Sequence, residues 1–124
     1  MFKHERLEVW QEAIQFVCDI YQQTRASPSD ERFGLTNQVR RSSNSIAANI
    51  AEGCSRSTDR EYVRFLEIAY ASLAKTVSHL EVSLRLTFLS PENHKDLRDR
   101  AERIGRMLSG LRTSLERSLS GPRP

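Results

Sequence analysis

Few side chains in this 124-residue chain are of the types that carry out catalysis or bind metals. Its three histidines, His4, His79 and His94, are far apart, and none follows a Glu at the Glu-x-x-His spacing of di-iron bundles. The segment that starts at His4 also lacks the second histidine of a zincin motif. Cys18 and Cys54 form neither a CxxC motif nor a zinc-ligand spacing, so we expect them to be buried, reduced thiols.

Motifs for phosphate binding and for nucleophilic catalysis are missing from the sequence as well. There is no P-loop, no glycine fingerprint for a dinucleotide and no G-x-S-x-G turn around a serine. The sequence therefore predicts a protein that is not an enzyme, with no catalytic residue, no cofactor and no metal.

The basic side chains are the remaining candidates for a binding function. The chain has 19 Lys and Arg against 16 Asp and Glu, a net charge of +3, and nearly all of the basic residues are Arg, which suits phosphate contact. Residues 91–124 carry eight basic and five acidic side chains and so hold the whole excess. The candidate nucleic-acid-binding residues are Arg40, Arg41, Arg56, Lys95, Arg103, Arg106 and Arg117.

The same charges also fit an ordinary solvated helix surface. Asp96, Asp99, Glu102 and Glu116 lie among the basic residues near the C-terminus, and no platform of aromatic and basic side chains is visible for stacking bases. A bias toward Arg also follows from the base composition of a genome. Both interpretations of the basic residues therefore stay open on the sequence.

Four long helical segments are expected to position these residues, at about 5–25, 34–52, 58–89 and 91–119. Thr58 followed by Glu61 is a capping-box pattern that begins the third helix. Ser90 and Pro91 fit the N-cap and the first position of the fourth. Gly53 stands where a C-cap glycine would end the second helix.

The expected architecture is a single all-α domain, residues 1–119, folded as an antiparallel up-down-up-down four-helix bundle, with a disordered tail at 120–124. No strand pattern competes with the helices. The sequence has no run of 18 apolar residues and no apolar leader, which predicts neither a membrane span nor a secretory signal. The expected compartment is the cytoplasm.

Two of the expected helices carry more apolar surface than one bundle core uses. The first has two apolar faces, made of Leu7, Trp10, Ile14, Val17 and Tyr21 and of Val9, Ala13, Phe16 and Ile20. The third extends its main stripe with Ile68, Val82, Leu86 and Leu89. This surplus predicts self-association into a homo-oligomer, and the alternative is a core that wraps widely around each helix.

A polar ribbon runs beside the apolar face of the second helix, formed by Gln38, Ser45, Asn49 and Glu52 and ending at Gly53. Because polar groups near a core must be hydrogen-bonded, the favoured interpretation is structural: bonds to the backbone of the loop before the third helix, or bonds across a subunit contact. Arg40 or Arg41 is then expected to pair with Glu31 or Glu52, and Asn49→Leu to impair assembly. A polar site for a ligand is the alternative.

The sequence of residues 31–53 is E-R-F-G-L-T-N-Q-V-R-R-S-S-N-S-I-A-A-N-I-A-E-G. It resembles a bacterial four-helix-bundle family first noticed as open reading frames within intervening sequences of 23S rRNA genes, whose pattern is close to E-x-F-G-L-x-x-Q-[IV]-R-R-A-x-x-S-I-x-x-N-I-A-E-G. The similarity covers roughly residues 5–90 and includes Leu7, Val9, Trp10, Ala13 and Tyr21, and Phe65, Leu66, Ile68, Ala69 and Ser72. Ser42 replaces an Ala, and Ala71 and Lys75 stand where the family more often has Gly and Glu.

The resemblance implies a left-handed antiparallel bundle that assembles as a ring-shaped homopentamer with a central channel. A relative in diversity-generating retroelements is an accessory of a reverse transcriptase and binds nucleic acid, which implies RNA or DNA as a partner besides the chain itself. The alternative is a protein-binding scaffold with no nucleic-acid activity. Because Lys75 replaces an acid, no contact made by that acid in relatives is carried over.

Overall fold

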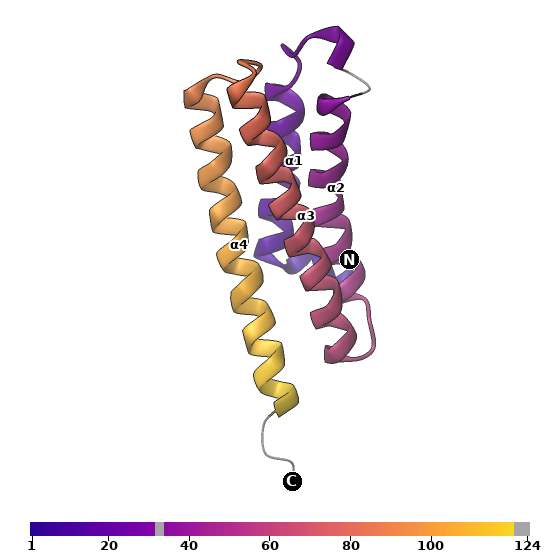
Figure 1. The fold of residues 1–124 in the computed structure, drawn as a ribbon. Coiled ribbons are helices and arrows are strands. Elements are labelled where there is room, and N and C mark those ends of the chain that lie inside the picture. Colours follow the sequence, from indigo (N-terminus) through magenta and orange to yellow (C-terminus); the bar gives the residue numbers. More distant parts are fainter. Residues whose placement is uncertain (32–33, 121–124) are drawn as a thin grey trace.

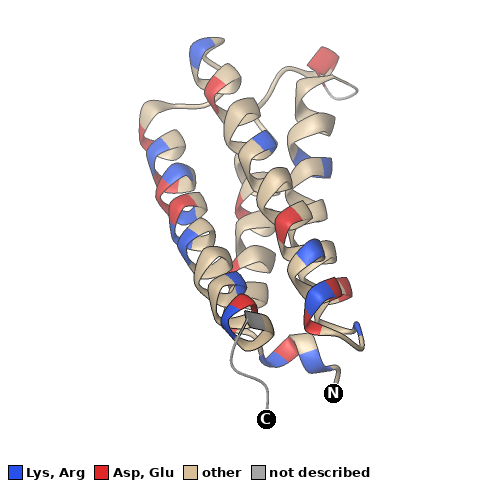
Figure 2. Cartoon of the chain, turned by 60° about the horizontal axis from the view of Figure 1, so that its bottom comes forward, with Lys and Arg blue, Asp and Glu red and all other residues tan. Residues whose placement is uncertain are grey.

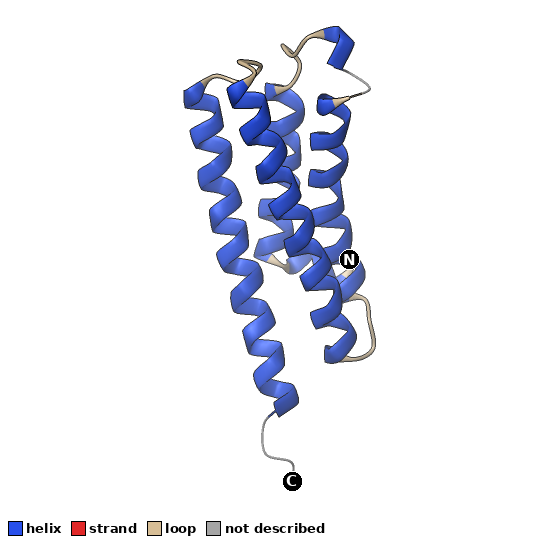
Figure 3. Ribbon diagram, in the orientation of Figure 1, coloured by secondary structure: helices blue, strands red, loops and turns tan. Residues whose placement is uncertain are grey.

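Four long helices form a bundle in which consecutive helices run in opposite directions (Figure 1). The computed structural model describes residues 1–31 and 34–120, and every regular element in this part is a helix (Figure 3). The elements are η1 (Lys3–Arg6), α1 (Glu8–Gln23), η2 (Ser29–Glu31), α2 (Leu35–Cys54), α3 (Asp59–Arg85) and α4 (Pro91–Ser120). This confirms the all-α bundle. Ser120, expected in the tail, ends α4, and the rest of the expected tail lies outside the described residues.

The bundle core takes one face from each long helix, and α1 and α3 each contact both α2 and α4. From α1 the core takes Val9, Ala13, Phe16 and Ile20, and from α4 it takes Leu97, Ala101, Ile104 and Leu108. The second apolar face of α1 is only partly covered, since Ile14 and Tyr21 are exposed. Ile68, Tyr70 and Val82 on α3 and Leu86 directly after it are exposed too, so the core does not wrap around these helices.

Side-chain caps begin α3 and α4 at the predicted residues, although the Glu61 carboxylate pairs with Arg64 and does not complete the expected capping box. The Thr58 hydroxyl accepts a hydrogen bond from the Glu61 backbone N–H at 3.2 Å, and the Ser90 hydroxyl accepts one from the Asn93 N–H at 3.1 Å. Each cap satisfies a backbone donor that the helix itself leaves unpaired. These two bonds fix where α3 and α4 start.

The end of α3 differs from the prediction, because the helix stops at Arg85 and not at Leu89. Thr87 has a φ of 64°, the left-handed conformation that usually belongs to glycine at this place. The Thr87 N–H bonds the Leu84 carbonyl at 3.0 Å and the Phe88 N–H bonds the Ser83 carbonyl at 2.9 Å, which together make a Schellman motif. Leu89 is therefore buried from the connection to α4 and not from α3.

Gly53 does not cap α2, since the helix continues to Cys54 and the Gly53 φ is not positive. A Cβ at this position would lie 2.8 Å from the Phe65 Cβ and 3.3 Å from the Tyr62 carbonyl oxygen, both on α3. Glycine is thus required here by the close approach of two helices and not by backbone conformation. The predicted helix stop at Gly53 was wrong for this reason.

The two cysteines lie in different environments. Cys54 is buried as expected, whereas Cys18 is exposed on α1, because it points away from the face that holds Phe16 and Ile20. Within the described residues, no helix combines the length and the apolar character needed to cross a membrane.

Candidate nucleic-acid interface

Acidic side chains neutralise much of the basic surface predicted on α4, where the two signs of charge alternate along the helix (Figure 2). The Lys95 Nζ lies 2.8 Å from the Asp99 Oδ2, and this hydrogen bond raises the pKa of Lys95. Arg103 bridges to α1, with its Nη2 3.0 Å from Glu8 and its Nε 3.4 Å from Glu12. Lys95 and Arg103 thus fit the interpretation of a solvated, ion-paired helix face better than that of a phosphate surface.

Two other candidates on α4 keep their charge unpaired. Within the described part of the chain, neither Arg106 nor Arg117 forms an ion pair, and both are exposed. Arg106 borders a groove of about 790 Å³ between α3 and α4, whose lining includes Tyr70 and Val77. On this helix, the positive charge that remains available for a partner comes mainly from these two arginines.

Arg40 is held by contacts with the end of α1. Its guanidinium lies 4.6 Å from the Tyr21 ring centroid, its Nε donates to the Thr24 hydroxyl at 3.0 Å, and its Nη2 donates to the Tyr21 carbonyl at 3.4 Å. These three contacts make the Arg40 guanidinium a structural link between α1 and α2. The expected pairing of Arg40 or Arg41 with Glu31 or Glu52 is absent among the described residues, and the Glu31 carboxylate instead accepts the Leu35 N–H at 3.1 Å.

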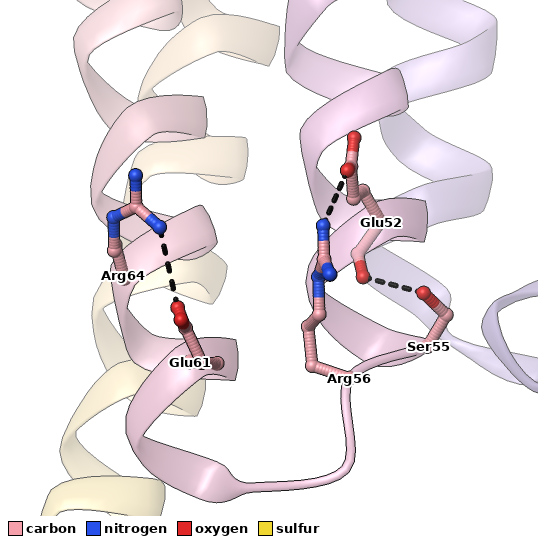
Figure 4. Close-up of polar contacts among 5 residues, drawn as sticks. All are labelled: Glu52, Ser55, Arg56, Glu61 and Arg64. Carbon is pink, nitrogen blue, oxygen red and sulfur yellow. Dashed lines mark hydrogen bonds and ion pairs between the residues drawn. The ribbon is translucent and has the colours of Figure 1, made fainter.

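Arg56, in the turn between α2 and α3, is also held by contacts within the chain (Figure 4). Its Nη2 lies 2.6 Å from the Glu52 carboxylate, and its guanidinium lies 4.6 Å from the Phe65 ring centroid. The Ser55 hydroxyl donates to the Glu52 carbonyl at 2.7 Å in the same turn. The Glu52 carboxylate therefore pairs with a side chain of the loop before α3, and not with the loop backbone that the sequence predicts as its partner.

Ser45 and Asn49 of the polar ribbon bond to α3 and to α2 itself. The Ser45 and Ser72 hydroxyls are 2.9 Å apart, which joins α2 to α3. The Asn49 amide nitrogen donates to the Ser45 carbonyl at 2.8 Å and to the Ser45 hydroxyl at 3.0 Å. Farther along, the Thr76 hydroxyl donates to the Ser42 hydroxyl at 2.7 Å. A row of hydroxyl pairs thus lies between these two helices.

Above this row, α2 and α3 border a surface groove of about 490 Å³. It is lined by Gln38, Arg41, Ser42, Ser45, Ser72, Lys75 and His79, with no carboxylate among them. Burial and the nearby Lys75 charge together hold the pKa of His79 below its ordinary value. We call this feature the α2–α3 groove. Chemically it offers two cations, hydroxyl donors and an imidazole.

Sequence reasoning found part of this groove and missed the rest. Arg41 was a candidate, and Gln38 and Ser45 belonged to the ribbon, but Lys75 was noted only as a departure from the family pattern and His79 was dismissed. Residues 72, 75 and 79 repeat the spacing of residues 38, 41 and 45, so each set lies on one helix face. That matched spacing is the signal in the sequence, but the helix register is needed to bring the two sets together.

Comparisons with known proteins agree with this architecture. The model of the family described as 23S rRNA-intervening sequence protein matches residues 5–110. A crystal structure of a protein of unknown function from the S23 ribosomal protein family of Bacteroides thetaiotaomicron superposes with a TM-score of 0.79. It is 22% identical in sequence, and the match covers 85% of this chain and 95% of that one. No curated protein matches the chain.

Proposed function

We propose that this chain, which belongs to the family of 23S rRNA-intervening sequence proteins, is a non-enzymatic homo-oligomer that binds RNA or DNA. The observation that carries the proposal is the contrast among its basic side chains. Lys95, Arg56 and Arg103 are paired with carboxylates, whereas Arg41, Arg106 and Arg117 are exposed and form no ion pair within the described residues. Unpaired arginines keep their capacity for phosphate contacts.

Self-association is the second part of the proposal, in the form of a ring of five copies. The exposed side chains of Ile68, Tyr70 and Val82 on α3, of Leu86 at its C-cap, and of Ile14 on α1 support self-association. Long apolar side chains of this number on one small domain are typical of a subunit interface. In a ring each unpaired arginine is repeated, so several weak phosphate contacts act together.

A short fluorescent single-stranded RNA and its DNA counterpart test the binding part by anisotropy, at low and at moderate salt. We expect affinity to fall steeply as salt rises, because phosphate contacts release counterions. Arg106→Glu with Arg117→Glu should weaken binding strongly. Lys95→Glu with Arg98→Glu is the matched control, since it changes the net charge equally at residues that are paired with Asp99 and Glu102. Equal losses in both variants contradict a role for the unpaired arginines.

A protein-binding scaffold is the second candidate function. The groove between α3 and α4 favours it, because Tyr70, Leu73 and Val77 give that groove an apolar lining. Absence of any anisotropy change at low salt would support this candidate over nucleic-acid binding. Native mass spectrometry of material purified from its own host counts the subunits and detects a co-purified RNA or protein in one measurement. A stable particle of 14.3 kDa in dilute solution would overturn the oligomer.

A further inference from the structure

We infer that the α2–α3 groove is a binding site for a phosphate oxyanion, held by Arg41, Lys75 and the hydroxyl pair of Ser45 and Ser72. The inference deepens the proposed function, because a backbone phosphate of RNA or DNA is one source of that group. Free inorganic phosphate is the other source, and it requires no nucleic acid. The site is distinct from the α4 arginines and is built from rigid helix positions on both sides of the groove.

Neither cation of the groove has a counter-ion among the described residues. Within the described residues, Arg41 and Lys75 form no ion pair, although most basic side chains on α3 and α4 have a carboxylate within 4.0 Å. Arg41 and Lys75 line one groove from opposite helices, and no carboxylate lines it with them. Two like charges repel each other across such a groove, and a bound anion removes that repulsion.

Ser45 and Ser72 together have one hydroxyl proton that no acceptor among the described residues uses. Ser45 and Ser72 carry one O–H each, and their 2.9 Å hydrogen bond uses one of the two. The Asn49 amide donates to Ser45 and so uses no hydroxyl proton. Neither hydroxyl has another acceptor among the described residues. Whichever serine donates to its partner, the other keeps an O–H that is free to donate into the groove.

The other hydroxyl pair in the row, Thr76 and Ser42, has no unused O–H, unlike Ser45 and Ser72. Thr76 donates to Ser42 at 2.7 Å, and Ser42 donates onward to the Val39 carbonyl at 3.2 Å. That pair is buried and leaves no proton over for a ligand. The spare donor therefore lies at Ser45 and Ser72, on the groove lining that also includes both unpaired cations.

His79 supplies a reporter inside the groove. Its pKa is lowered by burial and by Lys75 on its own helix, and Arg41 is the other charged group that lines the groove, from α2. An oxyanion bound between these cations adds a negative charge next to the imidazole and must raise the His79 pKa. Apolar or cationic ligands would leave it unchanged or lower it further.

The test is a titration of the full chain with inorganic phosphate and, separately, with a short single-stranded oligonucleotide, at low ionic strength. Affinity is measured by calorimetry, and the His79 pKa by NMR of its ring protons. We expect phosphate to bind and to raise the His79 pKa. Arg41→Gln and Lys75→Gln should each weaken binding about tenfold, since each removes a charged hydrogen bond. Ser72→Ala should cost several-fold, and Lys95→Gln, the matched loss of a paired charge, should leave the affinity unchanged.

The two ligands separate the failure of this inference from the failure of the proposed function. Phosphate binding that is lost in Arg41→Gln, with no oligonucleotide binding, supports the groove and contradicts the nucleic-acid role. Oligonucleotide binding that stays at the wild-type level in Arg41→Gln with Lys75→Gln overturns the groove and leaves that role standing. A His79 pKa that does not respond to saturating phosphate also overturns the inference. So does a double variant that changes the number of subunits without losing phosphate affinity, because the groove is then a subunit contact.

Discussion

Replacing Gly53 by alanine tests the close approach of α2 and α3, on which the row of hydroxyl pairs depends. The new Cβ would lie 2.8 Å from the Phe65 Cβ, 3.2 Å from the Tyr62 Cδ1 and 3.3 Å from the Tyr62 carbonyl oxygen. Two of these atoms belong to the α3 backbone or are fixed directly to it, so rotation of a side chain does not relieve the contact. The helices must move apart instead.

The magnitude follows from two opposing effects. Alanine is favoured over glycine inside a helix by about 0.8–1.0 kcal/mol. Overpacking a close contact costs about 1–3 kcal/mol. The overlap at Gly53 involves backbone on the opposing helix, which places the cost in the upper half of that range. We therefore expect Gly53→Ala to lower the free energy of unfolding by about 1–2 kcal/mol.

Gly110 is the matched control, since it lies inside α4 and a Cβ there would meet nothing within 4 Å. Gly110→Ala should raise the free energy of unfolding by about 0.5–1 kcal/mol, because only the helix preference operates. Gly105 is an intermediate case, with the Leu73 Cδ2 at 3.5 Å, an ordinary contact distance. Unfolding in urea followed by circular dichroism, at several protein concentrations, measures all three. If Gly53→Ala stabilises the protein as much as Gly110→Ala does, the close approach of α2 and α3 is wrong.

Three further predictions test local features. Thr87→Gly should raise the free energy of unfolding by about 1 kcal/mol, because glycine adopts the positive φ of 64° without strain; a loss of stability in urea would contradict the Schellman motif. Thr58→Ala and Ser90→Ala should each cost about 1 kcal/mol by removing an N-cap bond, whereas Ser55→Ala, which alters the C-cap of α2 and removes no N-cap bond, should cost less in the same assay. The pKa of His79 is lowered in the folded protein, so the unfolded chain binds a proton at this residue more readily. The free energy of unfolding should therefore fall as the pH drops through about 6.5. His79→Gln should make the free energy of unfolding depend less on pH in this range.

The sequence was a good guide where local chemistry decides the structure. The starts of α3 and α4 follow from Thr58 and Ser90, whose side chains cap within three residues of themselves. Apolar periodicity identified both apolar faces of α1, because each repeats with the helical period, but it did not predict which face packs into the core. The structure buries the face of Val9, Ala13, Phe16 and Ile20.

The predicted ends of α2 and α3 were wrong because they depend on contacts that the residue pattern of one helix does not show. Thr87 is not a residue that signals a helix end, so the stop of α3 depends on the backbone bonds that Leu84 and Ser83 accept. Gly53 resembles a cap in sequence, and only the position of Phe65 on the neighbouring helix shows its packing role. Both cases depend on how the chain is arranged in space.

The candidate site shows the same division between local and distant partners. The pairing of Lys95 with Asp99 follows from their spacing along one helix, so the sequence alone is enough to predict that the Lys95 charge is neutralised. The pairing of Arg103 with Glu8 joins residues from opposite ends of the chain, so the sequence alone does not predict it. The convergence of Arg41, Lys75 and His79 likewise requires the register between α2 and α3.

That register links the stability of the bundle to the chemistry of the groove. Small residues let α2 and α3 approach closely, and the short side chains of Ser45 and Ser72 meet across part of this contact. Short polar side chains satisfy one another in pairs, so they lie between the helices without the cost of unpaired groups. Longer cationic side chains at Arg41 and Lys75 cannot enter the contact and stand along its outer edge. The close contact that glycine permits at one end of α2 therefore also places free positive charge above hydroxyl donors farther along the helix.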